Sequence, residues 1–175
     1  MTDHTDLFLK QAFSEKPIGA STLILKNCFI KSATYEGMFD NGIPNQQLMQ
    51  HPVELASGGV GLTTVSYGAV SADARTIEEQ MYINERSLKP LETLANKVHE
   101  AGGKVSIQLT HCGFFSKNKK AKKILAPSKL FNAYGFLSGV GFSKAMQEND
   151  LEEVIEDFVR SALTLQSIGF DALEI

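Results

Sequence analysis

The sequence predicts an α/β protein with a parallel sheet, and three observations support that fold class. From residue 23 onward, short runs rich in β-branched residues alternate with helical runs, which is the order of strands and helices in α/β domains. The helical runs are amphipathic, so each has one apolar face to bury. No low-complexity linker divides the 175 residues, and a domain of about this length buries roughly 70% of its unfolded surface.

The composition narrows the classes of partner. Hydrophobic residues make up 43% of the chain and charged residues 21%, and the net charge is -3, which gives no electrostatic reason to expect nucleic acid or an anionic membrane. The N-terminus lacks a basic segment followed by an apolar core, and no apolar run approaches the ~20 residues that span a bilayer. We therefore expect a soluble, cytoplasmic protein with no nucleic-acid and no membrane partner.

The first part of the chain predicts two strands and one helix after an N-terminal β-hairpin. Residues 23–33 are β-rich, and residues 60–70 form a second strand bounded by glycines. Between them, residues 43–59 carry apolar side chains near helical spacing. Pro52 is expected to kink or interrupt that helix, because its ring removes a backbone donor.

The second part predicts two clearer helices and two more strands. A helix capped by Ser87 is expected to end at Gly102, and the third strand follows at residues 104–109, ahead of a long loop over residues 111–149. The face that this helix buries is predicted to hold Leu91, Leu94, Ala95 and Val98.

The last helix has the strongest pattern in the chain. Asp150 is expected to cap its start, with Glu153 completing a capping box, and Gly169 ends it ahead of a fourth strand over residues 170–175. Its buried stripe is predicted to hold Leu151, Val154, Ile155, Phe158, Ala162, Leu165 and Ile168.

The order of elements predicts part of a larger fold. A natural domain rarely stops inside a buried strand, and four strands with three intervening helices amount to half of a (β/α)8 barrel of ~250 residues. We therefore expect the N-terminal half of such a barrel, with about four parallel strands. Residues 1–175 would form a single incomplete domain that ends in the fourth strand.

Polar residues gather where the first three strands end. Ligands bind at the carboxyl ends of parallel strands, both in barrels and in open sheets. These side chains carry few charges, so a neutral, planar, hydrogen-bonding ligand would suit them, although any single Ser, Thr or His is more often a structural cap. The group comprises Ser32, Thr34, Tyr35, Ser66, Tyr67, Gln108 and His111.

Three other motifs have ordinary explanations. Cys28 and Cys112 lack the spacing of a disulfide framework or a metal site, so neither is expected. The segment "SGGVG" precedes a strand, whereas a dinucleotide-binding loop must follow one, so it is interpreted as a helix end. The run "KNKKAKK" is interpreted as a solvated loop, with a landing site for phosphate groups as the sharper alternative.

Several segments, in order, resemble one known family. They are "LKNCFIKSATYEG", "GGVGLTTVSYGAVSADAR", "VHEAGGKVSIQLTHCG", "APS" and "FVRSALTLQSIGFDALEI". Together they resemble the N-terminal half of the old yellow enzyme family, FMN-dependent ene-reductases related to 2-enoate and 2,4-dienoyl-CoA reductases. The resemblance implies a flavoprotein that passes hydride from NADH or NADPH, through FMN, to an enone or enoate substrate.

The resemblance also implies roles for individual residues. The tip of the first strand would lie against FMN, and Tyr67 would present its backbone to the pyrimidine edge of the flavin. Gln108 would hydrogen-bond that same edge through its side-chain amide. The cofactor-binding residues implied in this way are Ser32, Ala33, Thr34, Tyr35, Tyr67 and Gln108. No catalytic residue and no metal ligand is assigned.

The sequence departs from the family pattern in places. Cys28 and Phe114 stand where the family commonly has Arg, and Tyr35 stands where relatives have Thr or Cys. The His-rich segment that binds the substrate carbonyl would follow Ile175, and the FMN phosphate site would lie in the C-terminal half of the barrel. We therefore expect the 175-residue chain alone to bind FMN weakly or not at all, and to turn over nothing.

Two other interpretations stay open. One is a non-catalytic half-barrel that assembles with a separate second half, or with itself as a homo-oligomer, to cover its open sheet edges. The other is an unrelated barrel such as an aldolase, which would need a Schiff-base lysine at a strand end. Lys31 is the nearest candidate for that lysine.

Overall fold

The computed structural model describes residues 9–19 and 22–175, and a four-stranded parallel sheet forms its centre. The strands are β3 (Ile30–Lys31), β6 (Leu62–Ala69), β7 (Lys104–Thr110) and β10 (Ala172–Glu174). They lie side by side in the order in which they occur along the chain, and every neighbouring pair is parallel. Sequential neighbours are the pattern of a (β/α) barrel, whereas doubly wound sheets reverse their strand order.

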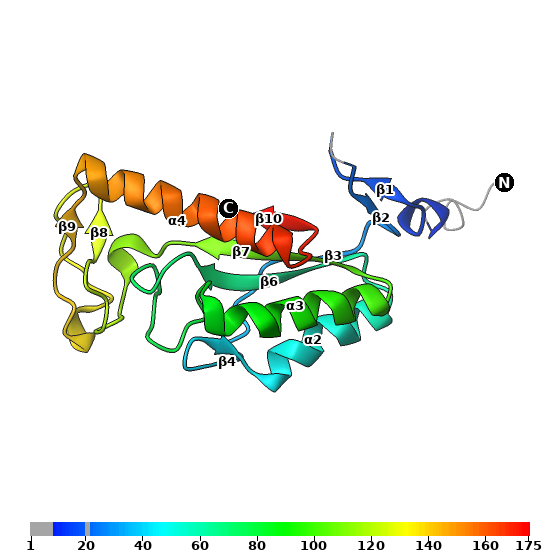
Figure 1. Cartoon of the computed structure of the whole chain (residues 1–175), viewed down its shortest axis with the longest axis horizontal. Coiled ribbons are helices and arrows are strands. Elements are labelled where there is room, and N and C mark those ends of the chain that lie inside the picture. The colour runs from blue at the N-terminus through cyan, green and yellow to red at the C-terminus, as the bar shows by residue number, and fades with distance from the viewer. Residues whose placement is uncertain (1–8, 20–21) are drawn as a thin grey trace.

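One helix precedes each later strand of this sheet. These helices are α2 (Gln46–Ser57), α3 (Glu85–Glu100) and α4 (Glu148–Ser167). Figure 1 shows α2 and α3 side by side, with α4 running along β7. Helix α2 contacts β6, and both α3 and α4 contact β7. No helix in the described part of the chain has an apolar stretch long enough to cross a membrane.

The two faces of β7 differ in chemistry because side chains alternate along a strand. Val105, Ile107 and Leu109 are buried in the core that the helices cover. The alternate residues are polar, and one of them, Ser106, shares a 2.7 Å hydrogen bond with Thr64 of β6. The face away from the helices is therefore lined by hydroxyl and amide groups.

The first predicted strand was wrong in its extent. Residues 23–33 divide into β2 (Ile24–Leu25), which pairs antiparallel with β1 (Lys16–Pro17), and β3 in the parallel sheet. The side chain of Asn27 causes the break, because its Oδ1 accepts from Phe29 N and its Nδ2 donates to Gly59 O. These local bonds turn the chain between the two short strands.

The helix starts also differ from the predicted ones. Helix α3 is capped by Asn84, three residues before the predicted cap Ser87, whose hydroxyl instead accepts from Asn84 N. Helix α4 starts after Gln147, and Asp150 accepts from Gln147 N, so Asp150 is the third residue of the helix in a capping box rather than the cap. Helix α2 continues through Pro52, so the expected interruption was wrong.

Helix α4 buries less of its apolar surface than its pattern predicted. Leu165 is fully buried, but Leu151 and Ile155 of the predicted stripe are exposed. The exposed apolar residues repeat every fourth position along one line of the helix, and we call them the α4 stripe. They are Leu151, Ile155, Val159 and Leu163.

The loops at the ends of the strands have short elements of their own. The chain between β3 and α2 forms the hairpin of β4 (Phe39–Asp40) and β5 (Ile43–Pro44). In the long loop before α4, β8 (Leu125–Ala126) pairs parallel with β9 (Lys144–Ala145). Two 3-10 turns, Gly113–Phe115 and Phe136–Ser138, complete this loop.

Asp171 fastens the start of β10 to its neighbours. Its carboxylate accepts from Lys104 Nζ and Val105 N at 2.9 Å each and is 2.7 Å from His99 Nε2. Its side chain is only 11% exposed. Desolvation raises the pKa of Asp171, but the hydrogen bonds from Lys104, Val105 and His99 outweigh it, so the pKa is lowered overall.

Asp171→Asn is expected to destabilise the fold by about 1–3 kcal/mol near neutral pH, because the charged acceptor is lost. The lowered pKa means that the carboxylate stabilises the fold above its unfolded pKa of ~3.9, and that this stability is lost as the pH falls through the folded pKa. Urea unfolding at a series of acid pH values should therefore show that the difference in unfolding free energy between wild type and variant shrinks as the pH falls. The control is Asp40→Asn, an exposed residue of the β4–β5 segment, and a difference that stays constant with pH would contradict the assignment.

Candidate cofactor site

A cavity of about 520 Å³ lies at the C-terminal ends of β6 and β7. Tyr67 comes from β6, and Gln108 and Thr110 come from β7. The loop after β7 closes the cavity on another side with Phe115 and Tyr134, whose ring centroids are 5.1 Å apart. Two of the six predicted cofactor residues, Tyr67 and Gln108, therefore line one cavity.

Tyr67 is presented by a bulge in β6. The register between β6 and β7 shifts between Val65 and Gly68, and Tyr67 has a φ of 57°, in the left-handed region that non-glycine residues rarely occupy. The carbonyl of Tyr67 accepts a 3.0 Å hydrogen bond from Gln80 Nε2, which holds the strained residue in place. Strained backbone of this kind concentrates at binding sites.

Gln80 is a site residue that sequence reasoning missed. Its side chain is buried, its Oε1 accepts from Thr76 N, and its Nε2 approaches Thr110 Oγ1 at 3.4 Å. Gln80 lies in an irregular loop without helical or strand periodicity. Its position in the sequence therefore gave no indication that it would support a strand end thirteen residues earlier.

Gln108 has its amide orientation set by the neighbouring strand. Its Nε2 donates to Glu174 Oε1 at 2.6 Å, and the two residues are register partners of β7 and β10. A primary amide has two N–H donors and a carbonyl acceptor, so this bond leaves one donor and the acceptor for a ligand. Gln108 can therefore match a ring edge that carries a carbonyl beside an N–H group.

The tip of β3 reaches the site only in part. The Tyr35 ring lies 5.3 Å from the Tyr67 ring, and Thr34 O accepts a 2.8 Å hydrogen bond from Ser66 Oγ. Ser32 and Ala33 precede these residues and do not line the cavity. Tyr35 thus lies beside Tyr67 without lining the cavity itself. All six residues stay predictions as cofactor contacts.

His111 and Cys112 have the properties of lining residues. Burial lowers the pKa of His111, although Asp157 and Asp73 raise it, and His111 Nδ1 accepts from Gly113 N. Burial raises the pKa of the Cys112 thiol, which donates to Arg75 O at 3.0 Å. Residues 9–19 and 22–175 hold no cluster of acidic, His or Cys residues suited to a metal ion.

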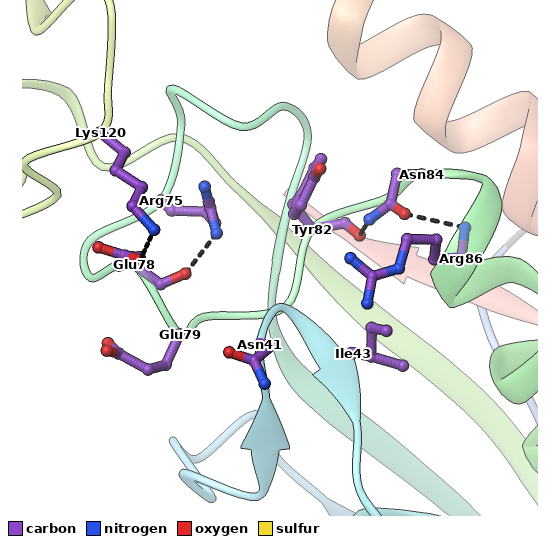
Figure 2. Close-up of a pocket in the computed structure, with 9 residues that line it drawn as sticks. All are labelled: Asn41, Ile43, Arg75, Glu78, Glu79, Tyr82, Asn84, Arg86 and Lys120. Atoms are coloured by element: carbon purple, nitrogen blue, oxygen red, sulfur yellow. Dashed lines mark hydrogen bonds and ion pairs between the residues drawn. The ribbon is translucent and has the colours of Figure 1, made fainter.

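A second cavity, of about 400 Å³, has a different character (Figure 2). Lys120 pairs with Glu78, and Arg75 donates to the Glu78 carbonyl and lies 4.7 Å from the Tyr82 ring. Figure 2 shows the Arg86 side chain entering the same space. This charged lining does not suit a neutral planar ring, so the cavity at Tyr67 and Gln108 is the better cofactor site.

Two lysines of the run after β7 form ion pairs with neighbouring segments. Lys120 pairs with Glu78, and Lys123 pairs with Asp150 and Glu153. These ion pairs fasten the loop to its neighbours. Lys117, the first lysine of "KNKKAKK", lines the cavity at the ends of β6 and β7. The solvated-loop interpretation and the phosphate-binding alternative both stay predictions.

The fold and the site together define a class of protein. Parallel strands in sequential order, covered by helices, carry a cavity at their carboxyl ends. The cavity offers the side-chain amide of Gln108, the backbone of the β6 bulge and aromatic rings. These groups fit the uncharged, planar, hydrogen-bonding ring of a flavin. The chain has the fold of part of a (β/α) barrel, with a ligand-sized cavity at the strand ends whose lining is compatible with a flavin ring.

Comparison with known proteins identifies the family. The family described as NADH:flavin oxidoreductase / NADH oxidase matches residues 15–175, and the chain belongs to it. One relative, the 4,4'-dithiodibutanoate disulfide reductase of Rhodococcus erythropolis, is 33% identical over 161 residues, covering 91% of this chain and 39% of the relative. The NADPH dehydrogenase of Geobacillus sp. (strain WCH70) is 34% identical over 137 residues, covering 78% of this chain and 38% of the relative.

Solved structures confirm the fold. Old Yellow Enzyme from Pichia sp. AKU4542 superposes with a TM-score of 0.84 at 20% identity, covering 93% of this chain and 45% of that one. Morphinone reductase in complex with tetrahydroNAD gives a TM-score of 0.79 at 20% identity, covering 93% of this chain and 48% of that one. The predicted N-terminal half-barrel and the resemblance to the old yellow enzyme family are therefore confirmed. The chain spans less than half the length of these relatives.

Proposed function

We propose that this chain is the N-terminal half of an FMN-dependent oxidoreductase that takes hydride from NADH or NADPH and reduces the carbon–carbon double bond of an α,β-unsaturated carbonyl compound. One observation carries the proposal: Tyr67 and Gln108, from neighbouring strands, line one cavity at the strand ends. Residues 1–175 would form one incomplete domain, with the second half of the barrel as its partner.

Each residue of the site has a separate task in this proposal. Gln108, oriented by Glu174, would hydrogen-bond the pyrimidine edge of the flavin with its free carbonyl and N–H group. The bulge at Tyr67 would offer backbone groups to the same edge, and Tyr35 would pack against the ring system. FMN, when bound, supplies the hydride chemistry, and the protein's part is to hold and orient it.

The names of the relatives support the reductant and the type of substrate. Several relatives are NADPH dehydrogenases, and morphinone reductase was solved with tetrahydroNAD. Another structural neighbour is a complex of 2-naphthoyl-CoA reductase with 2-naphthoyl-CoA. We propose a nicotinamide as the reductant for the complete protein, and a small-molecule enone or enoate as its substrate.

Titration with FMN tests the proposal. The 175-residue chain alone is expected to bind FMN weakly or not at all and to oxidise no NADH. The two-half protein, meaning this chain joined to or co-expressed with the second half of its barrel, is expected to bind one FMN per chain and to oxidise NADH or NADPH with an enone present. Tight FMN binding and NADH oxidation by the single chain would contradict the prediction that it holds only part of the FMN site. A two-half protein that binds no flavin would overturn the proposed oxidoreductase function.

A second candidate is a half-barrel without catalysis that pairs with another copy of itself. The α4 stripe favours it, because four large apolar side chains in line on one helix form a patch typical of contact surfaces. Size-exclusion chromatography separates the two: a stable dimer of the single chain supports self-assembly. A monomer that gains flavin only with the second half supports the oxidoreductase.

A further inference from the structure

An ion pair beside the proposed flavin site has no part in the function described so far. Lys31, at the end of β3, pairs with Glu36, five residues later. Both side chains are largely buried, Glu36 at 6% exposure and Lys31 at 18%. Buried charges of this kind persist only when they are paired and hydrogen-bonded, so the remaining contacts of the two side chains indicate their purpose.

Those contacts all go to the edge of β6. Lys31 Nζ donates to Thr64 O at 2.9 Å. Glu36 Oε2 accepts from Ser66 Oγ and lies 3.4 Å from Ser66 N. β3 pairs with β6 only through residues Ile30 and Lys31, so the backbone of β3 has already left the ladder at this point. The two side chains therefore take over the backbone donor and acceptor that a longer β3 would have bonded.

These side-chain contacts lie at the point where β6 changes its register with β7. Ser66 directly precedes Tyr67, the residue of the bulge whose φ is 57° and which lines the cavity. Glu36 directly follows Tyr35, whose ring contacts the Tyr67 ring. Glu36 and Ser66 are thus each next in sequence to a tyrosine that is a proposed flavin contact. The ion pair thus acts on the residue before Tyr67, whereas Gln80 binds the carbonyl of Tyr67 itself.

We propose that the Lys31–Glu36 pair acts on the bound flavin in two ways. Glu36 is a positioning residue that fixes the Ser66–Tyr67 bulge in the shape the cofactor requires. Together, the two opposite charges keep the electrostatic potential beside the flavin close to balanced, and so help to set its reduction potential. This inference rests on the proposed function, because it assumes that FMN occupies the cavity.

Reduction of a flavin adds electrons to it, so a fixed charge nearby changes the potential by its sign. Glu36→Gln leaves Lys31 unbalanced and is expected to raise the midpoint potential of FMN bound in the two-half protein. Lys31→Met leaves Glu36 unbalanced and is expected to lower it. The double variant Lys31→Met with Glu36→Gln removes both charges and should return the potential towards that of the wild type.

Opposite shifts separate this role from a structural one, because damage to the fold would move both single variants in the same direction. Shifts of the same sign, or no shift in either variant, would overturn the electrostatic part. For the positioning part, Glu36→Ala is expected to raise the FMN dissociation constant about tenfold. The control is Glu54→Ala, an exposed residue of α2, and equal dissociation constants for the two would overturn this part.

A measurement on the single chain keeps the positioning part testable without cofactor. Amide hydrogen exchange should become faster at Ser66 in Glu36→Ala, because its N–H loses the carboxylate, and should be unchanged in Glu54→Ala. Unchanged exchange would overturn the positioning role. A two-half protein that holds no flavin would instead overturn the proposed function, while the exchange result would still decide whether Glu36 shapes the bulge.

Discussion

Leu94→Ala is expected to lower the free energy of unfolding by about 2–5 kcal/mol. Leu94 lies on α3, is 0% exposed, and belongs to the core cluster formed with Leu91, Val105 and Ile107. Truncation removes its transfer free energy and leaves a cavity between the helix and β7, which neighbouring side chains fill only in part. Urea unfolding followed by circular dichroism measures the change.

Leu163→Ala is the matched control for this prediction. Leu163 lies on α4 and is 61% exposed, so the same truncation should change the stability of the single chain by no more than about 0.5 kcal/mol. A loss at Leu163 as large as the one at Leu94 would show that the α4 stripe is already buried in solution. That outcome would favour self-assembly of the half-barrel.

Gln108→Leu in the two-half protein is expected to raise the FMN dissociation constant by about 5- to 150-fold, equivalent to the ~1–3 kcal/mol of hydrogen bonds lost to a buried polar edge. Leucine has a similar size but offers neither the carbonyl nor the N–H group. Fluorescence quenching of added FMN gives the constant directly.

Gln50→Leu provides a control of the same chemistry. Gln50 donates to Glu54 at 2.6 Å, as Gln108 donates to Glu174, but it lies on the exposed side of α2. It should leave FMN affinity unchanged. If Gln108→Leu binds FMN as tightly as Gln50→Leu, then Gln108 is not a flavin ligand, and the choice of this cavity as the cofactor site is wrong.

The elements with strong periodicity could be predicted from the sequence. Helix α3, the strands β6 and β7, and their order in the sheet follow from apolar spacing and from glycine positions, and the structure has them within a few residues of the predicted bounds. The predicted helix starts were wrong where two polar residues competed for the cap. At α4, Gln147 and Asp150 bond reciprocally, and the pattern alone does not say which of the two is the cap.

Only the candidate site residues that stand at the ends of predicted strands could be proposed from the sequence. Gln108 and Tyr67 stand at strand ends, and strand ends are predictable. The contacts that support the site come from Lys31, Glu36 and Gln80. These contacts join residues far apart in the sequence or start from a loop, so the periodicity of apolar residues does not predict them. Lys31 entered the sequence reasoning only as a possible Schiff-base lysine, but its ion pair with Glu36 gives that alternative no support.

The α4 stripe also affects how the protein is made. In a polypeptide that carries both halves of the barrel, this half is synthesised first, and its core can fold while Leu151, Ile155, Val159 and Leu163 still face water. Exposed apolar surface of this kind makes a folding intermediate prone to aggregate and a substrate for chaperones. The yield of soluble single chain should therefore rise when the α4 stripe is made polar.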